Sequence, residues 1–460
     1  MGDAHEPEPL SGYDTTFFHF GERSPMHTLK CLVLDTGRRG SPVTLDDVRA
    51  AMAPRLGLHP RARQRAIRSA LPGRYAWHDD PDFALDRHLG ETTIETGSTF
   101  DDVCGHLATE QLPMDRPLWH ATLVHGLDDG RQAIVFRVHH SVMDGVGAAN
   151  TLRFFTTEHP GEAVPVADDA PWAPPPIPDE RRLRRHSLAR IPGWGRSLAT
   201  YASETVRTRE ERREDARLIR SRDDLIGLRS EATYGWTGER FSGRRVCAHG
   251  HLPFDRFSAV KERHGVSVND VLVAVVGEAV ADEAKDRGEE RDDDEIAMFS
   301  IALDTDPHRL CGNEIMAISV PMHTKGDDRA DRLQRIAATN HDQIELTRRQ
   351  QDRRSVRITD LWSRSFALGA RMFAYRIPTM VANVVMANVP GSPTTRWIGD
   401  VEVVDFVSYA VLVQPIGINV TVYSYDGRMS IGLLTAPEVI DDPYRLIGRM
   451  ATALDRFADA

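Results

Sequence analysis

Short apolar runs separated by turn residues predict strands in the first half of the chain. Such runs extend over Leu29–Leu34, Ala121–Val124 and Ala133–Val138, a length and composition typical of strands. The turn residues Asp128-Asp129-Gly130 lie between the last two runs and favour a hairpin. Because His139 follows the third run directly, a pair of histidines is expected at the end of a strand.

Residues suited to capping exposed backbone N–H groups mark several helix starts. Thr44 precedes two acidic residues, and Ser98 or Thr99 precedes a helical pattern that continues to residue 111. Further on, Ser267 and Asp270 have the spacing of a variant capping box ahead of an apolar run. We therefore expect helices to begin at all three places.

The second half alternates predicted strands and helices and finishes with a hairpin and a helix. Alternating apolar side chains predict the hairpin, and the Asp426-Gly427 pair predicts its turn. Strands and helices mixed in both halves indicate an α/β class with mixed sheets. The predicted strands are Arg244–Leu252, Ile296–Ala302, Val381–Met386 and the hairpin Ile416–Leu434; the predicted helices are Phe254–His264, Asp327–Asp352, Leu361–Tyr375 and Tyr444–Phe457.

Length and composition limit the class of protein. A chain of 460 residues exceeds what one hydrophobic core usually serves, so two domains or two similar halves are expected. The net charge of -11 argues against nucleic acid as the main partner. The four cysteines are scattered, which indicates reduced thiols and a cytoplasmic location. The longest apolar run, Val271–Val276, is much shorter than the ~20 residues that cross a bilayer.

A shift in composition divides the chain. Residues 158–178 are rich in proline and acidic residues, as in a connector. We predict an N-terminal subdomain over 1–178, an arginine-rich connector over 179–230 and a C-terminal subdomain over 231–460. Within the connector, Arg181–Asp224 contains no lysine and interleaves arginines with apolar residues. It is either an amphipathic helix on an anionic membrane or a solvated helix that bridges the two halves.

The segment His139-His140-Ser141-Val142-Met143-Asp144-Gly145 is the strongest candidate for chemistry. It combines a side chain that can take a proton near neutral pH with a carboxylate and a glycine. Neighbouring side chains of a strand point to opposite faces, so His139 and His140 are expected to have different roles. Asp144 could cap the following helix, orient a histidine or pair with a distant arginine.

Other candidate residues have structural explanations that are at least as strong. Pro117-Leu118-Trp119 is typical of a rigid turn packed on the core, and helix capping alone would explain Asn269-Asp270. No serine-hydrolase elbow, phosphate-binding loop or dinucleotide-binding loop is present in the sequence. His249 and His251 share a strand face but have no third ligand nearby, so no metal site is predicted.

Together these motifs resemble the bacterial wax ester synthases and acyl-CoA:diacylglycerol acyltransferases. This family lies within the coenzyme A-dependent acyltransferases that share His-His-x-x-x-Asp-Gly, a motif also found in condensation domains of peptide synthesis. The resemblance covers nearly the whole chain. It rests on Leu10–Asp14, Pro117–Trp119, His139–Gly145, Asn269-Asp270, Asn388–Gly391 and Asn419–Gly432.

The resemblance implies two subdomains with a solvent tunnel between them and the histidine motif at its centre. It assigns His140 as the general base that takes a proton from an acceptor hydroxyl, which attacks the acyl-CoA thioester without an acyl-enzyme. Asp144 is then expected to hold the loop, Gly145 to leave room for the backbone turn or for the substrate, and Asn269 to be a candidate oxyanion donor beside Asp270. No cofactor or metal is implied, because acyl-CoA is a co-substrate.

The expected acceptor is diacylglycerol, giving triacylglycerol, or a long-chain alcohol, giving a wax ester. The protein would work in the cytoplasm, with docking on the inner face of the membrane or on lipid droplets as an open question. Two alternatives remain: a condensation-type acyltransferase that uses a carrier-bound donor, and a non-catalytic lipid-binding relative. Acceptor identity and chain-length preference are left undetermined.

Overall fold

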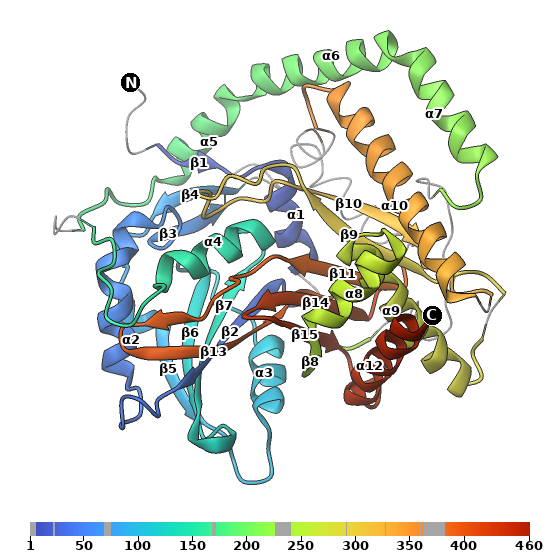
Figure 1. The fold of residues 1–460 in the computed structure, drawn as a ribbon. Coiled ribbons are helices and arrows are strands. Elements are labelled where there is room, and N and C mark those ends of the chain that lie inside the picture. Colours follow the sequence, from blue (N-terminus) through green and yellow to red (C-terminus); the bar gives the residue numbers. More distant parts are fainter. Residues whose placement is uncertain are drawn as a thin grey trace.

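Two six-stranded sheets and the helices that cover them make up a mixed α/β fold (Figure 1). The computed structural model describes residues 6–21, 24–68, 75–167, 172–225, 241–290, 292–326, 328–357, 361 and 382–460. The fold class and the two-part organisation expected from the sequence are confirmed.

The first sheet has the strand order β12-β13-β2-β7-β6-β5. Its central pair, β2 and β7, is antiparallel, and His27 lies opposite His139. The predicted hairpin of β6 and β7 is confirmed. The strands are β2 (His27–Asp35), β5 (Leu89–Thr93), β6 (Trp119–His125), β7 (Gln132–His139), β12 (Arg396–Ile398) and β13 (Val401–Tyr409).

Strands β12 and β13 cross from the range of the predicted C-terminal subdomain into the first sheet. Both strands lie within the predicted C-terminal range 231–460, yet β13 pairs along β2 from Glu402 opposite Asp35 to Tyr409 opposite Leu29. The first sheet is therefore completed by residues from late in the chain. Local sequence could not reveal this pairing, because strand partners so distant along the chain are chosen by the packing of the whole sheet.

The second sheet has the order β10-β9-β11-β14-β15-β8. β11 is parallel to both of its neighbours, whereas the other pairs are antiparallel. The predicted C-terminal hairpin is confirmed as β14 and β15. The strands are β8 (Val246–Pro253), β9 (Ile296–Ala302), β10 (Ile315–Pro321), β11 (Val384–Val389), β14 (Ile418–Tyr425) and β15 (Arg428–Thr435).

The two sheets meet closely where β13 passes β15. A Cβ atom on Gly432 would lie 2.1 Å from the carbonyl oxygen of Ser408, so only glycine allows the two backbones to approach this far. Helix α3 also packs against β8 and joins the two halves. A small third sheet, β1-β4-β3, lies at the N-terminal side; its strands are β1 (Glu8–Pro9), β3 (Gln64–Arg68) and β4 (Tyr75–Asp79).

Helices begin at the predicted caps. Thr44, Thr99 and Ser267 each form a capping box with the aspartate three residues later. These boxes satisfy backbone N–H groups that would otherwise lack partners. The helices of the two halves are α1 (Gly12–Gly21), α2 (Leu45–Met52), α3 (Phe100–Thr109), α4 (Gly145–Phe155), α8 (Phe254–His264), α9 (Val268–Asp286), α10 (Arg329–Asp352) and α12 (Pro443–Asp459), and a 3-10 helix spans Ala53–Leu58.

The arginine-rich connector forms three helices that arch over the molecule (Figure 1). They are α5 (Glu180–Ala189), α6 (Ile191–Arg207) and α7 (Arg209–Ser221). At its far end the arch is held to α10 by Asp215, which accepts hydrogen bonds from Arg349 at 2.8 Å and Arg353 at 2.6 Å. The connector therefore bridges the two halves, as one of the two sequence interpretations required.

Among the described residues, no single helix is long and apolar enough to cross a membrane. Helices α8 and α9 reach the required length and composition only when they are taken together, across a bend of 107°. Nearly all of the predicted helix Leu361–Tyr375 lies outside the described residues.

Candidate functional site

The histidine motif lies where β7 ends and α4 begins. His139 is the last residue of β7, and Gly145 is the first residue of α4. Backbone hydrogen bonds hold this connection in place. The His139 amide donates to the Leu118 carbonyl at 3.0 Å, and the His140 amide donates to the Met26 carbonyl at 2.8 Å. Backbone hydrogen bonds therefore hold both histidines in place, His139 at the end of β7 and His140 in the turn that follows.

The two imidazoles diverge, as the alternation of side chains predicted. The ring of His139 is buried, packs on Phe18 and has Nδ1 2.7 Å from the Ser141 hydroxyl. Burial, with added repulsion from His27 and His140, lowers the pKa of His139 to about 3. A ring enclosed in this way is neutral at neutral pH and supports the site from behind.

His140 is held by the side chain of Asn313. One amide atom of Asn313 lies 2.7 Å from Asp14 Oδ1 and 2.7 Å from the His140 carbonyl oxygen. Both of these partners are acceptors, so that amide atom is the donor Nδ2. The remaining atom, Oδ1, lies 3.1 Å from His140 Nδ1. Nδ1 therefore carries the proton and donates it to Asn313, which leaves the lone pair on Nε2.

Two residues of α1 complete this support. Phe17 stacks on the imidazole of His140, with ring centroids 4.3 Å apart and planes 11° apart. Asp14 anchors Asn313, and burial raises the pKa of Asp14 to about 6. Burial also lowers the pKa of His140, and the positive charge of Lys30 contributes in the same direction. Neutral His140, the form that a general base needs, is therefore favoured at pH 7.

Asp144 joins the motif to the segment that supplies Asn313. It caps α4 by accepting the Gly147 amide at 2.9 Å, and its Oδ2 accepts from Arg309 at 2.9 Å and from the Glu314 amide at 3.0 Å. The side chain of Asp144 is fully buried, and Arg309 is 11% exposed. Of the roles left open by the sequence, Asp144 thus performs capping and arginine pairing, and it places Asn313 indirectly.

Gly145 is explained by a close contact and not by a sharp turn. Its φ angle is not in the positive region, but a Cβ atom at this position would lie 3.0 Å from Val389 Cγ2 on β11. An alanine here would require Val389 to move by a few tenths of an ångström.

The Asn-Asp pair lies in the first turn of α9. Asp270 is buried and accepts from Ser267 and from Asn340 Nδ2 at 2.6 Å, so capping accounts for its contacts. Asn269 is exposed and accepts a bond from Asn388 Nδ2 at 2.8 Å. Because Val389 follows Asn388 and lies against Gly145, β11 connects this pair to the motif.

Pro117, Leu118 and Trp119 support the end of β7. Leu118 supplies the carbonyl that receives the His139 amide, and Trp119 pairs with Val138. The indole N–H of Trp119 donates to the Ala62 carbonyl at 2.8 Å. These contacts are structural, as the sequence favoured.

His249 and His251 each contact a carboxylate. Their spacing in the sequence had made them possible metal ligands. His249 Nδ1 lies 2.8 Å from Asp101, which also accepts from Tyr409 at 2.6 Å. His251 Nε2 lies 2.6 Å from Asp405. Within the described residues, no group of three metal-ligating side chains forms a cluster.

Sequence reasoning did not find Asn313, Arg309 or Phe17. Asn313 lies 173 residues from the histidine that it orients, and no spacing links the two. Asp14 appeared only as part of a resemblance, without a role. The available indication was the polar Gly312-Asn313 pair beside an apolar strand, which a single sequence does not distinguish from an ordinary turn.

Family profiles match both halves of the chain. The wax ester synthase/diacylglycerol acyltransferase catalytic domain matches residues 10–272, and the C-terminal domain of the same family matches residues 311–457. The Mycobacterium tuberculosis protein Rv3087, whose name gives diacylglycerol O-acyltransferase as a provisional activity, is 28% identical over 95% of this chain and 94% of its own. Another such protein, Rv3740c, is 25% identical over 86% of each chain.

Solved structures show the same architecture. The wax ester synthase/diacylglycerol acyltransferase from Marinobacter aquaeolei VT8 superposes with a TM-score of 0.65 at 20% identity, over 98% of this chain and 100% of the other. The first condensation domain of the calcium-dependent antibiotic synthetase gives a TM-score of 0.60 at 14% identity, over 99% and 97%. At these identities the likeness establishes the fold.

Proposed function

We propose that this chain, which belongs to the wax ester synthase/diacylglycerol acyltransferase family, transfers a long-chain acyl group from acyl-CoA to an alcohol. It is an acyltransferase of that family; the donor, the acceptor and the residue roles are the proposal. The acceptor is diacylglycerol or a long-chain alcohol. The observation that carries the proposal is the Asp14–Asn313–His140 arrangement, which fixes the proton on Nδ1 and leaves Nε2 free to act as a base.

The reaction follows from that arrangement. His140 Nε2 takes the proton of the acceptor hydroxyl while the hydroxyl oxygen attacks the thioester carbonyl carbon. The tetrahedral intermediate then expels the thiolate of coenzyme A, and the imidazolium returns the proton to that sulfur. Because the acceptor oxygen attacks directly, no acyl-enzyme forms. General base assistance of this kind contributes ~10²–10⁴ in rate.

The oxyanion of the intermediate needs hydrogen-bond donors, and Asn269 is our candidate. Its Oδ1 accepts from Asn388, so its amide nitrogen keeps two N–H groups for another partner. It also lies in the first turn of α9, where the helix dipole favours negative charge. We expect Asn269→Ala to lower kcat more than it changes KM.

Acceptor-dependent release of coenzyme A tests the activity. Free thiol is measured with palmitoyl-CoA alone and after addition of hexadecanol or dioleoylglycerol. Release is expected only with an acceptor, and His140→Ala is expected to abolish it. His106→Ala, an exposed histidine on α3, is the matched control. Unchanged release by the His140 variant would refute the base assignment, and faster transfer from an acyl-carrier protein would favour a condensation-type donor.

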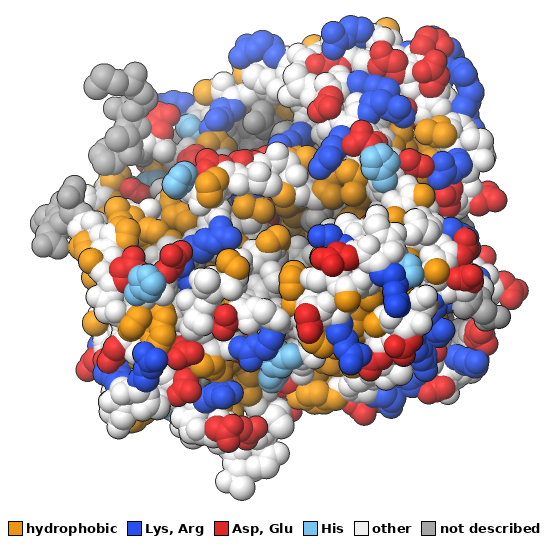
Figure 2. Space-filling view, viewed as in Figure 1, with side chains coloured by type: hydrophobic (Ala, Val, Ile, Leu, Met, Phe, Trp, Pro, Cys, Tyr) orange, Lys and Arg blue, Asp and Glu red, His pale blue; other side chains and the backbone are white. Residues whose placement is uncertain are grey.

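We further propose that the arch of α5, α6 and α7 docks on an anionic lipid surface. Ile191, Leu198 and Val206 are 41%, 45% and 74% exposed, and their spacing of seven and eight residues places them on one face of α6. Figure 2 shows Lys and Arg side chains, mixed with Asp and Glu, along the upper rim where the arch lies. Exposed apolar residues flanked by arginines suit a membrane interface.

Liposome co-sedimentation tests the docking. Binding to vesicles containing phosphatidylglycerol should weaken with added salt, after Leu198→Asp with Val206→Asp, and after deletion of Arg181–Asp224. Vesicle binding that is unchanged by salt, by the two substitutions and by the deletion would show that the arch is not the docking element.

A further inference from the structure

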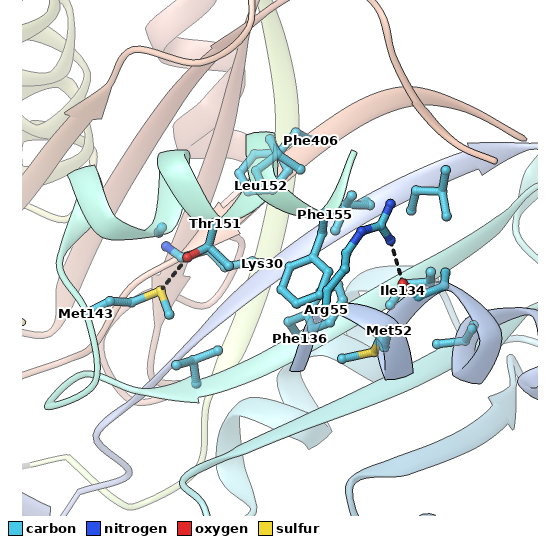
Figure 3. A pocket seen from close by; sticks show the side chains of 16 residues that line it. Lys30, Met52, Arg55, Ile134, Phe136, Met143, Thr151, Leu152, Phe155 and Phe406 are labelled. Atoms are coloured by element: carbon cyan, nitrogen blue, oxygen red, sulfur yellow. Dashed lines mark hydrogen bonds between the residues drawn. The ribbon is translucent and has the colours of Figure 1, made fainter. Parts of the chain in front are cut away.

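A mostly apolar pocket lies behind the histidine motif, between the first sheet and helices α2 and α4 (Figure 3). The pocket is partly open to solvent. Apolar side chains make up most of its wall, among them Leu32, Phe136, Met143 and Phe406. Met143 belongs to the histidine motif, so one residue of the motif lines the pocket.

Lys30 is an unexpected member of this wall. It lies on β2 opposite Phe136 of β7 and Ser408 of β13, on the sheet face that also presents Leu32. Its ammonium group donates to the Ser408 hydroxyl at 2.6 Å, and no carboxylate pairs with it among the described residues. Desolvation lowers the pKa of Lys30 to about 8.

Arg55 places a second cation in the same wall. It is 3% exposed, and its guanidinium donates to the Ala51 carbonyl. Its Nε atom is buried and has no hydrogen-bond partner in the described part of the chain, and no carboxylate pairs with it there. Figure 3 shows Lys30 with Met143 and Thr151 at one end of the pocket, and Arg55 with Met52 and Phe155 at the other.

Two cations without carboxylate partners are costly in an apolar wall. A buried charge loses its hydration and is normally paired within the protein. A ligand carboxylate would neutralise the ammonium of Lys30, and the chain of that ligand would lie along the apolar wall towards the open side of the pocket. We propose that this pocket binds a free long-chain fatty carboxylate, with the carboxylate on Lys30 and Arg55 adding positive potential.

This inference rests on the pocket itself and goes beyond the acyl-transfer proposal. A fatty carboxylate seated against Met143 would contact the loop that carries the histidine motif. The pocket would therefore sense the free fatty acid from which an acyl-CoA ligase makes the donor. Inhibition of transfer by fatty acid follows as a secondary consequence.

Direct binding tests the site without turnover. Titration calorimetry compares hexadecanoate, methyl hexadecanoate and hexadecanol at pH 7. The wild-type protein should bind the carboxylate at least about tenfold more tightly than the two neutral ligands, because only the carboxylate can accept a charged hydrogen bond from Lys30. Lys30→Met and Lys30→Gln should remove this preference and leave the affinity for hexadecanol unchanged.

Controls separate a binding site from a general effect of charge. Lys285→Met, at an exposed lysine of α9, should keep the preference. Lys30→Met should raise the unfolding temperature of the free protein, because it removes a desolvated charge, and should abolish stabilisation by hexadecanoate. Equal binding of hexadecanoate and its methyl ester by the wild type, or an unchanged preference in both Lys30 variants, would overturn the proposal.

The His140→Ala variant distinguishes this inference from the proposed function. It should bind hexadecanoate like the wild type, because His140 does not line the pocket. A protein that shows the carboxylate preference but no acyl transfer would support the pocket and refute the transfer reaction. A protein that transfers acyl groups but shows no preference for the carboxylate would support the transfer reaction and refute the proposed pocket.

Discussion

Replacing Asn313 by leucine should slow the reaction without changing substrate binding. The leucine removes the acceptor for His140 Nδ1 at 3.1 Å and the donor to Asp14 at 2.7 Å. Loss of one neutral hydrogen bond, about 1 kcal/mol, corresponds to roughly a fivefold effect. Loss of the fixed tautomer and ring orientation adds to it. We expect kcat to fall about 10- to 100-fold, within the ~10²–10⁴ that the base contributes.

Steady-state release of coenzyme A with a fixed acceptor measures this effect. The KM for acyl-CoA should stay near the wild-type value, because Asn313 acts through His140 and not on the substrate. The variant should also lose about 1–3 kcal/mol of stability, since buried partners of Asn313 lose a donor. Asn419→Leu is the matched control: Asn419, on β14 of the second sheet, is equally buried but donates to the Val411 carbonyl.

Two outcomes would refute this reasoning. A folded Asn313→Leu protein whose kcat stays within about twofold of wild type would show that the amide does not orient the base. An equal fall in kcat for Asn419→Leu would attribute the effect to general destabilisation.

Four further perturbations have defined outcomes. Asp144→Ala leaves its arginine partner buried without a carboxylate, so urea unfolding should show a loss of about 3 kcal/mol, accompanied by loss of activity. Gly145→Ala places a methyl group 3.0 Å from Val389 Cγ2 and should cost about 1 kcal/mol, and adding Val389→Ala should restore most of the unfolding midpoint. Burial lowers the pKa of His27 to about 4, so the unfolded chain gains a proton first as pH falls. His27 should therefore contribute about 3 kcal/mol to the fall in urea unfolding free energy between pH 6.5 and 4, and His27→Gln should reduce the fall by that amount. Because the pKa of His140 is also lowered, the acid limb of kcat/KM should fall below pH 6.5, and a limb above 7 would contradict the assigned base.

Local elements were predictable because their information is local. The capping boxes at Thr44 and Ser267 need only four consecutive residues, and the hairpin that turns at Asp426-Gly427 needs only alternation and a turn. The divergence of His139 and His140 follows from the geometry of a strand. In each case the physical cause spans a few residues, so a single sequence contains it.

Gly145 shows a limit of prediction from local sequence. The sequence indicated a glycine that eases a turn, whereas the structure uses it for a close contact with Val389, 244 residues further along the chain. The pairing of β13 with β2 in the first sheet likewise joins residues that lie far apart in the sequence. Such contacts join residues whose separation in sequence has no periodicity to detect.

The sequence by itself determined the elements, the family resemblance and the histidine proposed as the base. The tertiary structure decided how that histidine is held, by bringing Asn313 and Asp14 to one ring and by using Asp144 with Arg309 to fix the segment between them. It also set Lys30 and Arg55 facing one apolar pocket. Hydrogen bonds and buried charges depend on distance in space, and only the folded chain brings distant residues within that distance.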